Sequence, residues 1–235
     1  MNSKINSILN KDREKYLAVL GFISNYPIEE AFIEGDSVLI LGKSDQLWAH
    51  ILSSSESELA ILLEKYHIET KYYYSVEDWM IPLILKHGEE DWRMTTNRFT
   101  LNAQIDTDSP TCNIIQIDKS FASHMFNNSD YKDYLSIEYI EDRLNKDISA
   151  GIIIDDVLIA WGFTHDDGAL GFLNVLPKYR KKGYGLEIML GLIQMRKMDK
   201  KPIFGNIVPG NIASTNLVTK LGFKLDCKAS WIKLK

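Results

Sequence analysis

Residues 171–185, GFLNVLPKYRKKGYG, decide the fold of the second half of this chain. Residues 172–176 are short and mostly apolar, which is typical of a strand inside a sheet. Pro177 should end that strand, because it lacks the backbone N–H that a central ladder needs. After the glycines, residues 186–198 are apolar at helical spacing. The stretch therefore predicts a buried strand, a basic glycine turn, and a helix that must pack against a sheet.

The glycine turn predicts a site for a phosphate or a diphosphate. The first N–H groups of a helix have no partner inside it, and the helix dipole adds partial positive charge there. Gly183 and Gly185 allow close approach of a ligand, and fixed positive charge comes from Arg180, Lys181 and Lys182. A surface turn with solvated lysines remains an alternative. A Walker loop and a dinucleotide fingerprint fit poorly, because Tyr184 follows Gly183 and Glu187 stands where a third glycine is needed.

The composition is that of an ordinary soluble globular protein, with 45% hydrophobic and 25% charged residues. A chain of 235 residues can bury a sizeable core in one large domain or two small ones. The net charge of −5 argues against nucleic acid as the main partner, because binding phosphates requires a basic face. Residues 176–205 nevertheless carry eight Lys and Arg against Glu187 and Asp199. A small polyanion would be attracted to this stretch.

The two cysteines, Cys112 and Cys227, lie far apart in the sequence and lack metal-ligand spacing. We therefore expect no disulfide framework and no metal site, as in a reducing compartment. Residues 1–16 lack the apolar core of a signal peptide, and no apolar run is long enough for a bilayer. These features predict a cytoplasmic protein without a membrane partner.

Hydrophobic periodicity and turn residues predict the elements of the first half. In chain order they are a helix at 5–22, hairpin strands at 31–41 and 47–52, a helix at 55–66 with Ser55 as cap, a strand at 71–74, a helix at 76–86 and an extended segment at 91–101. The many aromatic residues of this half are interpreted as core rather than as a ligand platform.

Residues 102–110 are the best candidate for a linker, because Asp, Ser and Pro gather there. They predict an N-terminal α/β domain at 1–104 and a second domain at 105–235. The elements expected in the second domain are strands at 113–117, 151–154, 157–163, 172–176, 202–208, 223–227 and 229–234, and helices at 119–126, 131–146, 186–198 and 211–221. Both halves share the order strand–strand–helix–strand, so we hypothesise that the first is a degenerate copy of the second without the glycine turn.

Two segments resemble the GNAT acyltransferase superfamily. Residues 175–185, VLPKYRKKGYG, are similar to its acyl-CoA-binding motif, Arg/Gln-x-x-Gly-x-Gly/Ala after a strand. Residues 211–223, NIASTNLVTKLGF, are similar to the family segment that follows at the usual distance. The resemblance covers residues 112–235. Residues 161–163, WGF, and the long N-terminal extension look most like the glycine N-acyltransferase-like branch.

The resemblance implies an α/β (α+β) fold of GNAT type, with a mixed, mostly antiparallel sheet flanked by helices. It also implies that acetyl-CoA or another acyl-CoA lies in the gap between the central strand and the next strand. The cofactor-binding residues that it assigns are Leu173, Val175, Arg180, Lys181, Lys182, Gly183, Tyr184, Gly185, Asn211, Ser214 and Asn216. Asn211 has a second interpretation as a helix N-cap, and both roles are compatible.

The catalytic residues cannot be carried over from the family. The position of its usual proton-donating Tyr is Val218, and that of the glutamate base of glycine N-acyltransferases is Ala169. His165, Asp166 and Asp167 are candidates for a base, against the alternative of a solvated hairpin turn. Candidates for an acid are Tyr134, Tyr139 and Tyr184.

The sequence leaves three functional hypotheses open. The first is an N-acyltransferase that moves an acetyl or other short acyl group from acyl-CoA to a small amine or amino acid. The second is a GNAT-fold protein that binds acyl-CoA without catalysis, and the third is a non-enzymatic scaffold. We expect the acceptor pocket to involve residues 113–143 and the N-terminal half, in a monomer or a homodimer.

Overall fold

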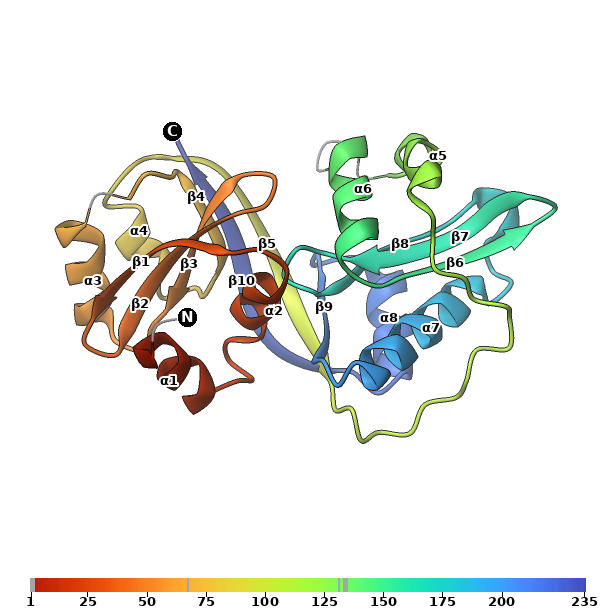
Figure 1. The fold of residues 1–235 in the computed structure, drawn as a ribbon, viewed down its shortest axis with the longest axis horizontal. Helices are drawn as coiled ribbons and strands as arrows, with labels where there is room; N and C mark the ends of the chain where they lie inside the picture. Colours follow the sequence, from red (N-terminus) through yellow and green to blue (C-terminus); the bar gives the residue numbers. More distant parts are fainter. Residues whose placement is uncertain (1–2, 67, 131, 133–134) are drawn as a thin grey trace. The chain divides into compact units, whose positions relative to one another are not determined.

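The computed structural model describes residues 3–66, 68–130, 132 and 135–235, and Figure 1 shows its ribbon. Contacts within the chain divide it into two compact units. The first unit contains Met1–Arg98, Ile207–Asn211 and Leu225–Lys235, and the second contains Phe99–Asn206 and Ile212–Lys224. This division differs from a cut between residues 104 and 105, because the end of the chain supplies a strand to the first unit.

The first unit is a sheet with helices on both faces. Its elements are α1 (Ser3–Lys11), α2 (Leu17–Asn25), β1 (Ile28–Glu34), β2 (Ser37–Lys43), β3 (Leu47–Leu52), α3 (Glu56–Lys65), β4 (Tyr72–Val76), α4 (Ile81–Ile84), β5 (Glu90–Leu101) and most of β10 (Lys224–Leu234). The strand order is β1-β2-β3-β4-β10-β5, followed by β9 (Ile203–Ile207).

Alternation along β2 builds a core on each face of this sheet, because successive side chains of a strand point to opposite sides. Leu39 packs in one cluster with Leu59 of α3, and Ile40 packs in another with Ile8 of α1. The mixed, mostly antiparallel sheet flanked by helices confirms the expected fold class.

Three predictions for the first half are wrong in their boundaries. The helix expected at 5–22 is two helices, and the Asp12 carboxylate between them accepts from the Lys15 N–H at 3.0 Å. The strand expected at 31–41 is β1 and β2, joined by a turn in which Gly35 has φ +55°. The helix expected at 76–86 is reduced to the four residues of α4.

The cap of α3 confirms the expectation that Ser55 begins this helix. The Ser55 hydroxyl accepts from the Glu58 N–H at 3.3 Å, as an N-cap should. The Glu58 carboxylate does not complete a capping box, because it accepts from Asp36 N and Ser37 Oγ in the β1–β2 turn. Ser55 therefore caps α3, and Glu58 in the first turn of the same helix binds the turn of the β1–β2 hairpin.

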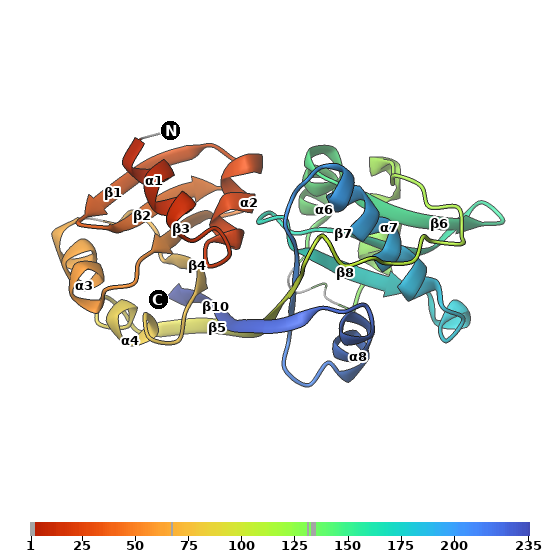
Figure 2. The ribbon, with the colours of Figure 1, turned by 90° about the horizontal axis from the view of Figure 1, so that it is seen from below.

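The second unit has a three-stranded antiparallel sheet, β6-β7-β8, with helices on both faces (Figure 2). Its elements are η1 (Lys119–Phe121), α5 (Ala122–Asn127), α6 (Ile137–Lys146), β6 (Ser149–Ile154), β7 (Val157–Thr164), β8 (Leu170–Val175), η3 (Pro177–Tyr179), α7 (Tyr184–Met198), β9 and α8 (Ile212–Lys220). Figure 1 shows α7 on one face of this sheet and α5 and α6 on the other. The expected strand and helix around the glycine turn are confirmed as β8 and α7.

Three expectations for the second half also change. Residues 113–117 form no strand, and their pairing is a single bridge between Ile115 and Gly151. The two closing strands are one continuous strand, β10. The linker at 102–110 is fastened to α7, because Lys197 Nζ donates to Ile105 O at 2.6 Å and Gln194 donates to Ser109 Oγ at 2.9 Å.

The order of elements repeats along the chain, as the hypothesis of a degenerate copy requires. A helix pair, a three-strand meander, a helix, a strand, a helix and a strand occur first as α1 to β5 and again as α5 to β10. The pairing of the last strand departs from a simple repeat. β10 belongs to the second set of elements, but it pairs antiparallel with β4 of the first set.

The two copies differ at the strands that flank the middle helix. In the first copy β3 and β4 form a parallel ladder, with Trp48 opposite Tyr72 and His50 opposite Tyr74. In the second copy β8 and β9 belong to different sheets, and no ladder joins them within the described part of the chain. The edge of β8 that faces away from β7 therefore has no strand partner among the described residues, and it lies next to the glycine turn.

Candidate functional site

A bulge interrupts β8 at the centre of the candidate site. Asn174 pairs with Trp161 and Gly171 pairs with Phe163, so Phe172 and Leu173 together lie opposite Gly162 alone. Phe172 has φ +48°, in the left-handed region. A bulge leaves its extra residue without a ladder partner. It therefore frees backbone groups in the middle of β8, at one of the predicted positions, Leu173.

The turn after β8 presents a row of backbone donors. Gly183 is the N-cap of α7 with φ +90°, and its carbonyl accepts from the Leu186 and Glu187 N–H groups at 2.9 and 3.2 Å. No acceptor among the described residues bonds the N–H groups of residues 181–185. Such unpaired amides at a helix N-terminus are suited to an anion.

The predicted residues of the strand and of the turn meet in this structure. A Cβ added to Gly185 would lie 3.8 Å from both Leu173 Cδ2 and Val175 Cγ2, so these side chains point toward the first turn of α7. A Cβ added to Gly183 would meet nothing within 4 Å, so the space over this residue is open. Arg180 Nε donates to Val175 O at 2.9 Å, which links the turn to the strand end.

Several positively charged side chains lie at the turn together with the unpaired amides. The Tyr184 ring packs edge-on against Tyr179, with centroids 6.3 Å apart. Lys178 and Lys182 place their ammonium groups over the Tyr179 ring at 4.9 and 5.5 Å. Arg180 also forms an exposed ion pair with Asp130 at 3.6 Å. Lysine and arginine groups around unpaired amides fit a diphosphate in both charge and donor number.

The remaining cofactor candidates lie on or next to α8. Asn211 directly precedes the helix and belongs to the first unit, and its N–H donates to Val208 O at 3.1 Å. Ser214 and Asn216 lie within the helix, in the second unit. The contact of these three residues with a cofactor stays a prediction.

The turn that carries the three base candidates is buried, so the alternative of a solvated hairpin turn is wrong. Asp166 and Asp167 are 4% and 0% exposed. The Asp167 carboxylate accepts from the Ala169 N–H at 2.9 Å, and Arg196 donates to Gly168 O at 2.7 Å. These carboxylates are placed to hold the turn. His165 is partly exposed, and burial together with nearby Arg143 lowers its pKa to about 4, so its imidazole is neutral at pH 7.

Aromatic rings gather around the bulge on the α6 face of β8. The Phe172 ring lies 4.1 Å from His165, 4.5 Å from Phe163 and 6.0 Å from Tyr139, measured between centroids. His165 and Tyr139 were candidates from the sequence, whereas Phe163 and Phe172 were not expected at the site. No local signal marks Phe172, because the bulge is defined only by the register against β7. Tyr134, the other acid candidate of this region, lies outside the described residues.

A buried ionic cluster lies next to the turn at 165–168. Arg196 of α7 binds the Asp147 carboxylate through both terminal nitrogens, at 2.8 and 3.1 Å, and Arg143 of α6 lies 3.4 Å from it. Burial alone would raise the pKa of Asp147, but its charge interaction and hydrogen bond with Arg196 outweigh it and lower the pKa. Arg143 Nε also donates to Thr164 O at 3.1 Å. The cluster ties helices on both faces to the end of β7.

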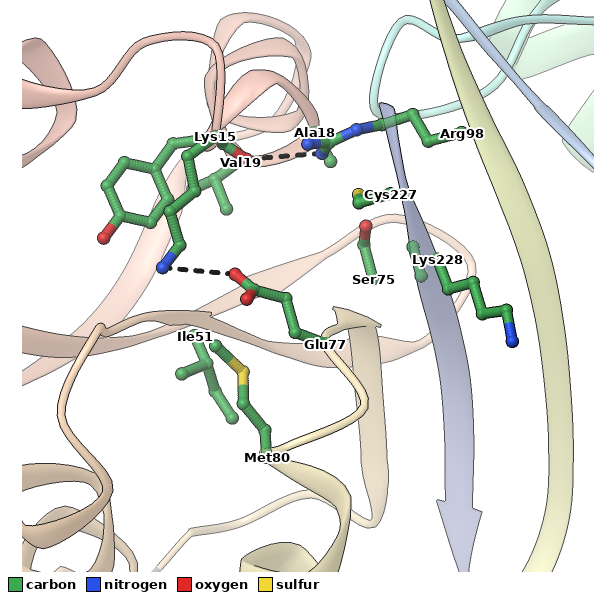
Figure 3. Close-up of a pocket in the computed structure, with 12 residues that line it drawn as sticks. Lys15, Ala18, Val19, Ile51, Ser75, Glu77, Met80, Arg98, Cys227 and Lys228 are labelled. Carbon is green, nitrogen blue, oxygen red and sulfur yellow. Dashed lines mark hydrogen bonds and ion pairs between the residues drawn. The ribbon is translucent and has the colours of Figure 1, made fainter. Parts of the chain in front are cut away.

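The first unit has a small cavity between α2, β4, β5 and β10, shown in Figure 3. Its volume is about 20 Å³, enough for one water molecule. Lys15 and Glu77 form an ion pair across it at 3.3 Å, and Arg98 donates to Lys15 O at 3.3 Å. Burial raises the pKa of Cys227 in its wall to about 11, so the thiol is protonated at neutral pH. The cavity is too small for a cofactor.

Two classes of site find no support among the described residues. No group of three or more His, Cys, Asp or Glu side chains gathers there to hold a metal ion. None of the helices in the same part of the chain has both the length and the apolar character needed to cross a bilayer.

Comparisons with known proteins point to one fold. Residues 151–232 match the FR47-like protein family. A solved Drosophila protein is 19% identical, over 99% of this chain and 96% of that one, with a TM-score of 0.79. A GCN5-related N-acetyltransferase from Kribbella flavida is 12% identical over 94% of both chains, with a TM-score of 0.60. A GNAT-family acetyltransferase from Colwellia psychrerythraea is 11% identical over 97% of both, with a TM-score of 0.54.

No curated protein matches the sequence. The family match begins within β6 and ends within β10, so it includes the bulge, the glycine turn and α7. These findings confirm the resemblance to the GNAT superfamily, whereas the glycine N-acyltransferase-like branch stays a prediction. The chain has the fold of the GNAT acetyltransferases, and its residues 151–232 carry an FR47-like sequence within that fold.

Proposed function

We propose that this chain is an N-acyltransferase, and that its second unit binds acetyl-CoA or another short acyl-CoA. The observation that carries the proposal is the run of unpaired amides at 181–185 beside the unpaired edge of β8. The amides and Arg180 would hold the diphosphate, and the backbone of β8 around Leu173 would bind the pantetheine arm and the acyl carbonyl. When bound, the thioester supplies the activated acyl group.

The first copy of the element order gives an internal contrast that favours this assignment. Its turn between β3 and α3 is Ser53-Ser54-Ser55, without glycine or a basic residue, and Ser55 caps the helix. Its β3 and β4 close the gap with a parallel ladder. We therefore assign the diphosphate and the pantetheine arm to the glycine turn and β8 of the second unit, and not to the corresponding turn and strand of the first.

In the proposed reaction a neutral amine of a small molecule or amino acid attacks the thioester carbonyl. The new C–N bond forms, the C–S bond breaks, and the amine loses a proton while the thiolate gains one. The chain's contribution is to position the carbonyl and to place backbone donors where negative charge develops on its oxygen. His165 and Tyr139 lie near the bulge, whereas Asp166 and Asp167 are buried in the turn.

The first prediction concerns Gly183. Gly183→Asp places a carboxylate beside the free amides, where it competes with a diphosphate for them. Gly183→Asn is the matched control, because it has nearly the same size and the same demand for a positive φ but carries no charge. By calorimetry we expect coenzyme A to bind the aspartate variant at least tenfold more weakly than the asparagine variant. Equal affinities, or no binding by the unaltered protein, would contradict the proposal.

Turnover separates the proposal from its alternative, a GNAT-fold protein that binds acyl-CoA without catalysis. The specific observation that favours the alternative is Val218, a buried side chain at the position of the family's proton-donating Tyr. Thiol release from acetyl-CoA with a panel of primary amines and amino acids supports an acyltransferase. Tight binding with no release across the panel supports a sensor.

A further inference from the structure

Phe172 has a backbone conformation that its residue type disfavours. Its φ of +48° lies in the left-handed region, which bulky residues rarely enter because Cβ clashes with the backbone. Most other non-glycine residues with positive φ lie in turns, as Asp155, Asp156 and Lys200 do, whereas Phe172 lies inside a paired strand. Such a conformation persists only where the surrounding structure imposes it.

The rings around Phe172 supply that constraint. Phe163 stacks on it at 4.5 Å with an interplanar angle of 13°, and His165 lies at 4.1 Å with an angle of 33°. Phe163 is only 1% exposed, so its ring has a fixed place in the core. The Phe172 side chain is therefore held against β7, which keeps its backbone turned.

The lack of a side chain at Gly171 leaves space for the His165 ring beside Phe172. A Cβ added to Gly171 would lie 2.2 Å from His165 Nε2 and 2.6 Å from its Cδ2. Any larger residue at 171 would push the imidazole away from Phe172. The neutral state of the ring suits the arrangement, because an imidazolium here would be close to the buried guanidinium of Arg143.

We propose that His165 is a positioning residue, which holds Phe172 in the left-handed conformation and so keeps the backbone groups at 172–173 free of the β7 ladder. The inference rests on the proposed function, since those groups lie where the acyl carbonyl is expected. His165 then acts on the reaction through Phe172 and transfers no proton.

Three variants of the full chain test the proposal. His165→Ala removes the ring, and His165→Phe keeps a ring but cannot accept a proton. The double variant His165→Ala/Phe172→Gly replaces the strained residue with one that adopts positive φ freely. We expect acetyl transfer to fall at least tenfold in His165→Ala, to stay within threefold of the unaltered protein in His165→Phe, and to recover at least threefold in the double variant.

Two further measurements use the protein without ligand or turnover. The NMR coupling between the amide and α protons of residue 172 should report loss of the positive φ in His165→Ala and its retention in His165→Phe. The affinity for coenzyme A should change less than the rate of acetyl transfer in all three variants, because the diphosphate binds the 181–185 amides, which are separate from the stack.

The outcomes distinguish this inference from the proposed function. Loss of activity in both His165→Phe and the double variant would make His165 a base and overturn the positioning role. An unchanged φ at residue 172 in His165→Ala would also overturn it. Absence of coenzyme A binding by the unaltered protein would refute the proposed function instead. If His165→Ala does not fold, the activity of His165→Phe decides alone.

Discussion

Several single side chains in this protein have roles that differ from those that the residue type alone suggests. Arg180 belongs to the basic turn, yet its Nε is bound to Val175 O and its terminal nitrogen faces Asp130. A lysine there would keep the charge but lose the planar fork that reaches both partners. Asp167 has the chemistry of a base, yet it closes its own turn. At this scale, local hydrogen bonds hold Arg180 at the end of β8 and Asp167 within its own turn.

His50 in β3 gives a prediction about acid stability. The residue is fully buried between the rings of Phe22 and Tyr74, and neither ring nitrogen has a hydrogen-bond partner among the described residues. Burial lowers the pKa of His50 from 6.5 to about 3. Between these values the unfolded chain binds a proton that the folded chain refuses, so stability falls as the pH falls from 6.5 toward 3.

His50→Phe should remove this contribution while keeping a ring in the stack. Urea unfolding of both proteins at several pH values measures the difference. Between pH 6 and pH 4, we expect the free energy of unfolding of the unaltered protein to drop relative to the variant by about 1.4 kcal/mol per pH unit. Parallel curves would show that His50 does not titrate on unfolding.

At the scale of elements, α7 links the glycine turn to the segment that precedes α5. The Glu187 carboxylate in its first turns accepts from the Thr111 and Cys112 N–H groups, and Gln194 and Lys197 continue the attachment along the helix. Burial would raise the pKa of Glu187, but these hydrogen bonds outweigh it and lower the pKa. One face of α7 is thus bonded to residues between 105 and 112, and those up to 110 belong to the linker that the sequence predicts.

Glu187→Gln tests that attachment. An amide has one acceptor oxygen and no charge, so the variant loses at least one charge-assisted bond. We expect it to lose about 1–2 kcal/mol of stability by urea unfolding. Faster hydrogen exchange should be confined to the amides around residues 111 and 112. Glu141→Gln, at an exposed position of α6, serves as the control, and an equal effect of both substitutions would contradict the prediction.

Elements with a strong local sequence pattern could be predicted, whereas features that depend on contacts with a distant segment of the chain could not. The strand, glycine turn and helix around residue 183 carry Pro, Gly and helical spacing in one continuous stretch, and all three are found. The β1–β2 turn was missed although Gly35 marks it. The bulge at Phe172 depends on register with β7, and the buried turn at 165–168 depends on Arg196 from a distant helix. Single-sequence patterns do not contain such pairings.

At the scale of the whole molecule, two copies of one element order have different roles in our proposal. The first copy closes its parallel ladder between β3 and β4, and the second keeps the corresponding edge of β8 unpaired. The first copy also depends on the end of the chain, because β10 lies between β4 and β5 in its sheet. Residues 1–104 therefore do not contain all of the first unit.

The missing strand predicts how a fragment behaves. A polypeptide of residues 1–104 leaves β4 and β5 without their shared neighbour, and unpaired strand edges favour aggregation. We expect it to lack a cooperative unfolding transition. A synthetic peptide of residues 224–234 added in trans should restore the transition, and the same peptide with Ile232→Pro should not, because Ile232 pairs with Tyr73. Cooperative unfolding of the fragment alone would contradict this assignment.

The position of β10 also sets an order for biosynthesis. Domains near the amino terminus commonly fold while the ribosome is still translating the later parts of a chain. Here the sheet that is translated first lacks one strand until residues 224–234 have left the exit tunnel. The edges of β4 and β5 that β10 covers therefore stay without their neighbour until this strand has been translated and has emerged.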